Sequence, residues 1–80
     1  MKSRLGYKGY VIEARSDELR AGEFSAELSI EQHEGAGVTE TQFYLPHTFL
    51  SQELAIAAAI QAGQQKIDVG FERGRAVASG

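Results

Sequence analysis

Apolar and polar residues alternate along three segments of the chain, and each segment predicts a β-strand. The segments are residues 7–15 (YKGYVIEAR), residues 23–33 (EFSAELSIEQH) and residues 38–45 (VTETQFYL). The second alternates most regularly, because each apolar residue from Phe24 to Ile30 is followed by a serine or a glutamate. A period of two places apolar side chains on one face of a sheet and polar side chains on the other. We therefore expect three strands with one face in the core and one in water.

A different period follows the strands, and it predicts a helix over residues 52–67. Alanine and glutamine dominate this stretch, and both favour helices. Ser51 stands at the position of an N-cap, where its hydroxyl accepts a hydrogen bond from the first turn. With the helical period of about 3.6 residues, Ala55, Ala59 and Gly63 form a ridge of minimal side chains on one face. Such a ridge lets the helix backbone approach a sheet closely. We therefore interpret the alanines as residues for close packing rather than for binding or catalysis.

The order of these elements, strand–strand–strand–helix, predicts an α+β domain. Three strands joined by short connections favour a three-stranded antiparallel meander, with the C-terminal helix packed across one face. We assign residues 1–69 to this single small domain. Residues 70–80 (GFERGRAVASG) have no clear period, so we expect a flexible tail there. The other face of the sheet is expected to stay open to solvent.

Length and composition narrow the class of protein. The chain has 80 residues, no cysteine and a net charge of −3. The absence of cysteine fits a reducing compartment, the N-terminus does not resemble a secretory signal, and no stretch is apolar enough to span a membrane. We therefore expect a cytoplasmic protein without a membrane partner. A small core without disulfides is modestly stable, so we expect a monomer or a weak homodimer.

The sequence contains no group of residues typical of catalysis or of cofactor binding. His33 and His47 are far apart and lack the spacing of metal ligands. Serine and threonine occur, but none lies in a nucleophile-elbow motif. Gly35 and Gly37 precede a predicted strand rather than a helix, which argues against a phosphate-binding loop. We therefore expect a protein that is not an enzyme and that uses no metal or cofactor.

The open face of the sheet carries the candidate partner-binding residues. Alternation within the first segment places Tyr7, Val11 and Glu13 on that face. The candidates combine apolar or aromatic side chains with carboxylates, and they are Tyr7, Val11, Glu27, Glu31, Glu40 and Tyr44. Two interpretations are open: a contact surface for another protein, or a solvated face whose charges keep the sheet soluble. A flat sheet has no pocket that would separate the pKa values of a catalytic carboxylate pair.

Three stretches carry a resemblance to a known group of proteins. They are YKGYVI in the first strand, GEFSAELSI over the second strand, and FLSQELAIAAAIQAGQQKID over the helix. The chain resembles small proteobacterial proteins of the Burkholderia and Pseudomonas kind, which have a Y-G-Y-x-I start, a G-x-[FW]-x-A second strand and an A-x-x-x-A-x-x-x-G helix. The resemblance covers residues 7–68 and implies the strand–strand–strand–helix fold. That family has no established function, so the resemblance implies no activity and no site residue.

The predicted topology is also similar to the last four elements of a double-stranded-RNA-binding domain. The N-terminal helix of those domains is missing here, and residues 51–54 (SQEL) are acidic where those domains have lysines. Basic residues are scattered along the chain rather than clustered, which also argues against nucleic acid. We therefore expect a non-enzymatic module that binds another protein through the open sheet face. The alternative is a nucleic-acid-associated protein with a truncated version of that topology.

Overall fold

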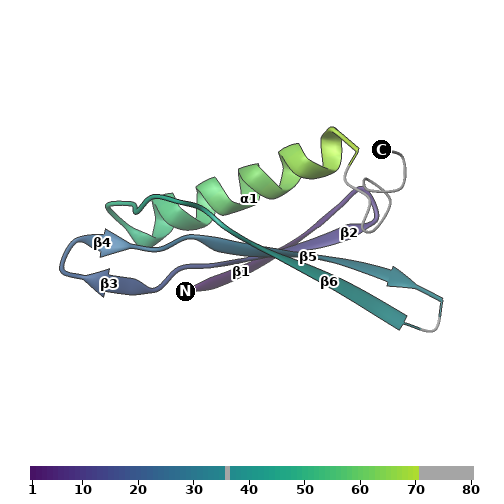
Figure 1. The fold of residues 1–80 in the computed structure, drawn as a ribbon, viewed down its shortest axis with the longest axis horizontal. Coiled ribbons are helices and arrows are strands. Elements are labelled where there is room, and N and C mark those ends of the chain that lie inside the picture. The colour runs from purple at the N-terminus through teal and green to yellow at the C-terminus, as the bar shows by residue number, and fades with distance from the viewer. Residues whose placement is uncertain (36, 71–80) are drawn as a thin grey trace.

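A four-stranded sheet is covered on one side by a single helix in the computed structural model, which describes residues 1–35 and 37–70 (Figure 1). The α+β class, the antiparallel sheet and the C-terminal helix agree with the sequence prediction. From residue 71 onward the predicted flexible tail lies outside the described residues. In chain order the elements are β1 (Lys2–Tyr7), β2 (Tyr10–Arg15), β3 (Glu18–Arg20), β4 (Glu23–Phe24), β5 (Glu27–Glu34), β6 (Gly37–Tyr44) and α1 (Gln52–Asp68).

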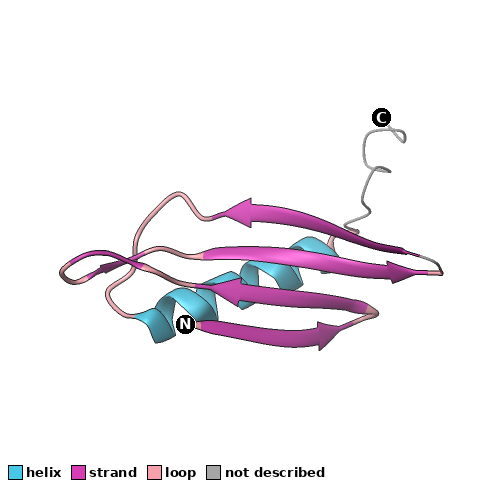
Figure 2. Ribbon diagram, turned by 90° about the horizontal axis from the view of Figure 1, so that it is seen from below, coloured by secondary structure: helices cyan, strands magenta, loops and turns pink. Residues whose placement is uncertain are grey.

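The main sheet has the strand order β1-β2-β5-β6, and each neighbouring pair is antiparallel. It therefore has four strands, whereas the sequence predicted three. β3 and β4 form a separate two-stranded sheet within the connection between β2 and β5. α1 packs against β2, β5 and β1. Figure 2 shows the helix behind the strands, and no other described element crosses the near face of the sheet.

The first hairpin accounts for the additional strand. The sequence predicts one strand over residues 7–15, but the chain reverses at Lys8 and Gly9 so that β1 pairs with β2 along its whole length. Lys8 has a φ of 52° and Gly9 a φ of 87°. Positive φ at both central residues is typical of a type I′ turn, whose twist matches that of paired strands. Lysine rarely adopts this conformation, so Lys-Gly is a much weaker turn signal than Asn-Gly.

The β3–β4 hairpin extends beyond the end of the main sheet and holds the segment before the helix. It divides the strand predicted over residues 23–33, because β4 ends at Phe24 and β5 begins at Glu27. Phe24 and Phe49 exchange two backbone hydrogen bonds, at 2.9 and 2.8 Å. This bridge packs Phe49 against the core and fixes where the chain enters α1.

The helix begins and ends close to the predicted positions. The Ser51 hydroxyl accepts a hydrogen bond from the backbone N–H of Leu54 at 3.1 Å, which satisfies a donor that the first turn leaves free. At the other end Gly70 has a φ of 97°, and its N–H donates to the carbonyl of Ile67. Glycine adopts this left-handed conformation readily, so the chain leaves the helix after Asp68.

The ridge of small residues on α1 lies directly on the sheet, as its spacing predicts. Ala55 and Ala59 are fully buried, and Gly63 is buried one turn further on. A Cβ atom placed on Gly63 would lie 2.9 Å from Cγ2 of Ile12 and 3.1 Å from Cδ1 of Leu28. The helix backbone is therefore as close to β2 and β5 as their side chains allow. The other buried apolar residues of the core are Ala14, Ala26, Ile30 and Ile67.

Candidate functional site

The face of the main sheet opposite α1 carries a continuous array of mostly polar side chains. Ile12, Leu28 and Ile30 are buried on the helix side, so the residues that alternate with them point to the other side. This surface, visible in Figure 2, is termed the open face. Its residues are Lys2, Arg4, Val11, Glu13, Arg15, Glu27, Ser29, Glu31, His33, Val38, Glu40, Gln42 and Tyr44.

The structure places every candidate residue except Tyr7 on the open face. β2 contributes Val11, β5 contributes Glu27 and Glu31, and β6 contributes Glu40 and Tyr44. Glu31 lies directly opposite Glu40 in the register of β5 and β6, and Glu27 lies directly opposite Tyr44. Directly opposite side chains in an antiparallel pair are close enough to interact. These candidates therefore form two cross-strand pairs on one surface.

The expected position of Tyr7 on the open face is wrong. Because the turn at Lys8 intervenes, Tyr7 belongs to β1 and lies opposite Tyr10, on the side of the sheet that α1 covers. Its hydroxyl donates to the carboxylate of Asp68 at the end of α1, at 2.9 and 3.0 Å from the two oxygens. Tyr7 thus connects the first hairpin to the helix.

Basic side chains that were not among the candidates neutralise carboxylates on the open face. Nη1 of Arg4 lies 3.3 Å from Glu31 and 3.8 Å from Glu13. Nη2 of Arg15 lies 3.0 Å from Glu27. The role of Arg4 depends on β1, which the sequence pattern did not predict as a strand. The alternation of basic with other residues in KSRL is the signal that could have revealed it.

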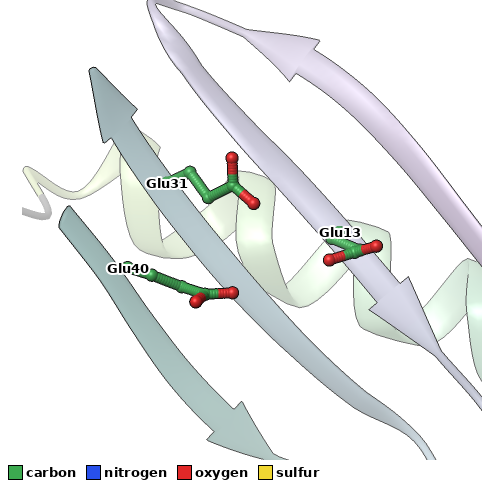
Figure 3. A group of neighbouring side chains, drawn as sticks. All are labelled: Glu13, Glu31 and Glu40. Atoms are coloured by element: carbon green, nitrogen blue, oxygen red, sulfur yellow. The ribbon is translucent and has the colours of Figure 1, made fainter. Parts of the chain in front are cut away.

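Three carboxylates on the open face come close together (Figure 3). Glu13, Glu31 and Glu40 each offer an oxygen within 4.8 Å of the others, and they project from three neighbouring strands. A bound Ca²⁺ takes about six to eight oxygen ligands, whereas the guanidinium of Arg4 already lies beside two of these carboxylates. We therefore interpret the cluster as an acidic surface partly neutralised by arginine, and we assign no metal ion to it.

A second polar cluster joins the first hairpin to the end of the helix. Nζ of Lys8 donates to the carboxylate of Asp68 at 2.7 Å, beside the bond from Tyr7. The hydrogen bonds from Lys8 and then Tyr7 lower the pKa of Asp68 below its ordinary value of 3.8. The bond to Asp68 also raises the pKa of Tyr7 above 10.0, because the carboxylate favours the protonated phenol. Since Lys8 and Asp68 are exposed, the cluster orients the hairpin more than it stabilises the fold.

Replacing Asp68 with asparagine is expected to return the pKa of Tyr7 toward its ordinary value of 10.0, because the new side chain is uncharged. The Tyr7 Cζ resonance, followed by NMR during a pH titration, measures this change. The part of the pH dependence of stability that Asp68 contributes should disappear as well. In the wild type the Asp68 contacts stabilise the fold fully above pH 3.8, and this stabilisation is lost as the pH falls through the lower pKa of the folded state.

The control for this substitution is Glu53→Gln, which removes an exposed carboxylate in the first turn of α1. It should leave the pKa of Tyr7 unchanged. The same Tyr7 pKa in the wild type and in Asp68→Asn would contradict the assigned contact.

Comparisons with family models, with curated proteins and with solved structures find no match to this chain. The resemblance to small proteobacterial proteins therefore stays a prediction. Within residues 1–35 and 37–70, no helix has the length and apolar character needed to cross a membrane.

Proposed function

We propose that this domain is a protein-interaction module that binds another protein through the open face. The support comes from β6, one of the two edge strands of the main sheet. Val38 and Tyr44 are 59% and 69% exposed although both side chains are large and apolar or aromatic. Glu40 lies between them on the same face and is also exposed. One strand therefore presents two apolar contacts on either side of a carboxylate.

The charge of Glu40 is the observation that carries the proposal. Glu31 and Glu13 share the guanidinium of Arg4, at 3.3 and 3.8 Å. Glu40 makes no ion pair with any residue in the described part of the chain, yet its carboxylate lies within 4.8 Å of theirs. Neighbouring carboxylates repel each other, and a cation supplied by a partner would relieve that repulsion.

The partner that fits this surface has a lysine or arginine next to an apolar or aromatic side chain. Its cation would lie beside Glu40 and Glu31, and its apolar group would pack on Tyr44 or Val38. This arrangement is typical of protein contacts, in which aromatic anchors combine with charge complementarity. A nucleic acid fits poorly, since its phosphates would meet the carboxylates of Glu40 and Glu31.

Two charge reversals, one on each side of the molecule, test this proposal. Wild-type protein, Glu40→Lys and Glu53→Lys are immobilised, and the proteins that each retains from a lysate of the expressing cells are quantified by mass spectrometry. A partner of the open face should be retained by the wild type and by Glu53→Lys, which changes α1. Glu40→Lys should retain it at least about tenfold less, because like charges would then meet in the contact.

The purified partner is then used for NMR chemical-shift mapping, which locates its contact on the domain. Resonances of Val38, Glu40 and Tyr44 should move, and Tyr44→Ala should weaken binding independently of charge. Equal retention of all proteins by the three immobilised forms, or shifts confined to α1, would overturn the proposal.

A further inference from the structure

The main sheet has two edges, β1 and β6, which differ in how well they are protected against pairing with another strand. β1 contains Lys2, Arg4 and Gly6, and charged residues on an edge discourage such pairing. β6 contains no lysine, arginine or proline, and most of its residues favour strands. Its register with β5 is continuous, without a bulge. A long, regular edge of this kind is a template for a further strand.

The outward-facing backbone groups of β6 follow from the hydrogen bond next to it. Leu45, just beyond β6, donates its N–H to the carbonyl of Ala26 at 3.0 Å and continues the β5–β6 register. Hydrogen bonding alternates along an antiparallel strand, so the odd-numbered residues of β6 bond to β5. The even-numbered residues point their N–H and C=O groups outward, and these are Val38, Glu40, Gln42 and Tyr44.

We infer that β6 pairs antiparallel with β6 of a second copy of this chain, in a register centred on Thr41. In that register Val38 lies opposite Tyr44 of the second copy, and Glu40 lies opposite Gln42. Every outward-facing residue then exchanges backbone hydrogen bonds with another outward-facing residue. The pairing also brings together the two most exposed apolar side chains of β6 as an aromatic–aliphatic cross-strand pair.

The neighbouring registers are less favourable. Opposite residues must have their side chains on the same face of the sheet, so both residue numbers of a pair are even or both are odd. The centre of a symmetric pairing therefore falls on a residue and not between two residues. Centring on Glu40 would place that carboxylate opposite its own copy, and directly opposed like charges destabilise a strand pair. Centring on Gln42 would place Val38 opposite Pro46, which has no N–H to donate. The register centred on Thr41 avoids both penalties.

The symmetry of the pairing determines the shape of the dimer. Its two-fold axis is perpendicular to the sheet, so both helices lie on one side and both open faces on the other. The open face stays accessible in the dimer, and Val38 and Tyr44 then contribute both to the strand pair and to the proposed partner contact. Self-association would also provide stabilisation that a core of this size lacks by itself.

Sedimentation velocity over micromolar to millimolar concentrations tests the inference on wild-type protein and Gln42→Pro. Proline at position 42 removes an outward N–H and no bond to β5, and edge strands tolerate proline at such positions. The monomer should therefore fold, while the dimer loses a hydrogen bond twice by symmetry. We expect a reversible wild-type dimer and a dissociation constant raised at least about tenfold in the variant.

The matched control is Gly6→Pro, which makes the same change on the other edge. Met1 and Ser16 exchange backbone hydrogen bonds at the start of the β1–β2 pair, so the odd-numbered residues of β1 bond to β2 and the N–H of Gly6 points outward. Gly6 also has open space for a side chain. This variant should dimerise like the wild type. Val38→Glu leaves the backbone groups in place and should also weaken the dimer, which keeps the test decisive if Gln42→Pro does not fold. A monomeric wild type, or a dimer that only Gly6→Pro disrupts, would overturn the inference.

Discussion

Replacing Gly63 with alanine is expected to lower the free energy of unfolding by about 1–2 kcal/mol, because overpacking outweighs helix propensity. At an exposed helix position the same change would raise it by about 1 kcal/mol. Here the added Cβ atom would lie 2.9 Å from Cγ2 and 3.1 Å from Cδ1 of Ile12, and 3.1 Å from Cδ1 of Leu28. Ile12 is fully buried, so it cannot make room without displacing its neighbours in a densely packed core.

Urea denaturation followed by the helical circular-dichroism signal measures this effect. Ala57→Gly is the control, because Ala57 lies on the exposed side of α1 and the swap there reports helix propensity alone. That control should lose about 1 kcal/mol. A Gly63→Ala protein more stable than the wild type would show that α1 does not lie closely against β2 and β5.

The elements that depend on regular periodicity could be predicted from the sequence, and those that depend on an unusual turn could not. The alternation of Leu28 and Ile30 and the spacing of Ala55 and Ala59 each involve one element, and their burial confirms the prediction. β1 was missed because its position depends on Lys8, a non-glycine residue with a φ of 52°. No local pattern indicates that conformation, which is maintained by the pairing of β1 with β2 along their length.

The candidate site, too, could be predicted from the sequence only in part. Alternation within β5 and β6 is enough to place Glu31 and Glu40 on the same face, and the structure agrees. The ion-pair partner of Glu31 could not be predicted from this alternation, since Arg4 lies 27 positions earlier in the chain. Their contact requires the register across β1, β2 and β5, which side-chain periodicity does not determine. The acidic surface was therefore predictable, but not which of its carboxylates lacks an ion pair among residues 1–35 and 37–70.

Truncating Ile12 to alanine is expected to lower the free energy of unfolding by about 2–5 kcal/mol. Ile12 is one of the largest fully buried side chains, and it fills the space below the ridge of α1. A core of this size supplies only about 3–5 kcal/mol of net stability, so a substantial fraction of the variant should be unfolded without denaturant. Ile12→Val removes one methylene group and should lose about 0.5–1.5 kcal/mol. This variant should stay folded without denaturant, so urea denaturation can measure its free energy of unfolding against that of the wild type.

Because Ile12 and Gly63 are in contact, the effects of substitutions at these two positions on stability should not be additive. Ile12→Ala removes two of the three atoms that an added Cβ on Gly63 would approach most closely, so Gly63→Ala should lose less stability in that background or even restore some. Ile12→Val removes only Cδ1 and should give a smaller coupling of the same sign. Ala57→Gly, away from the contact, should be additive with either substitution. Additive effects of Ile12→Ala and Gly63→Ala would contradict a direct contact between the helix backbone and the sheet.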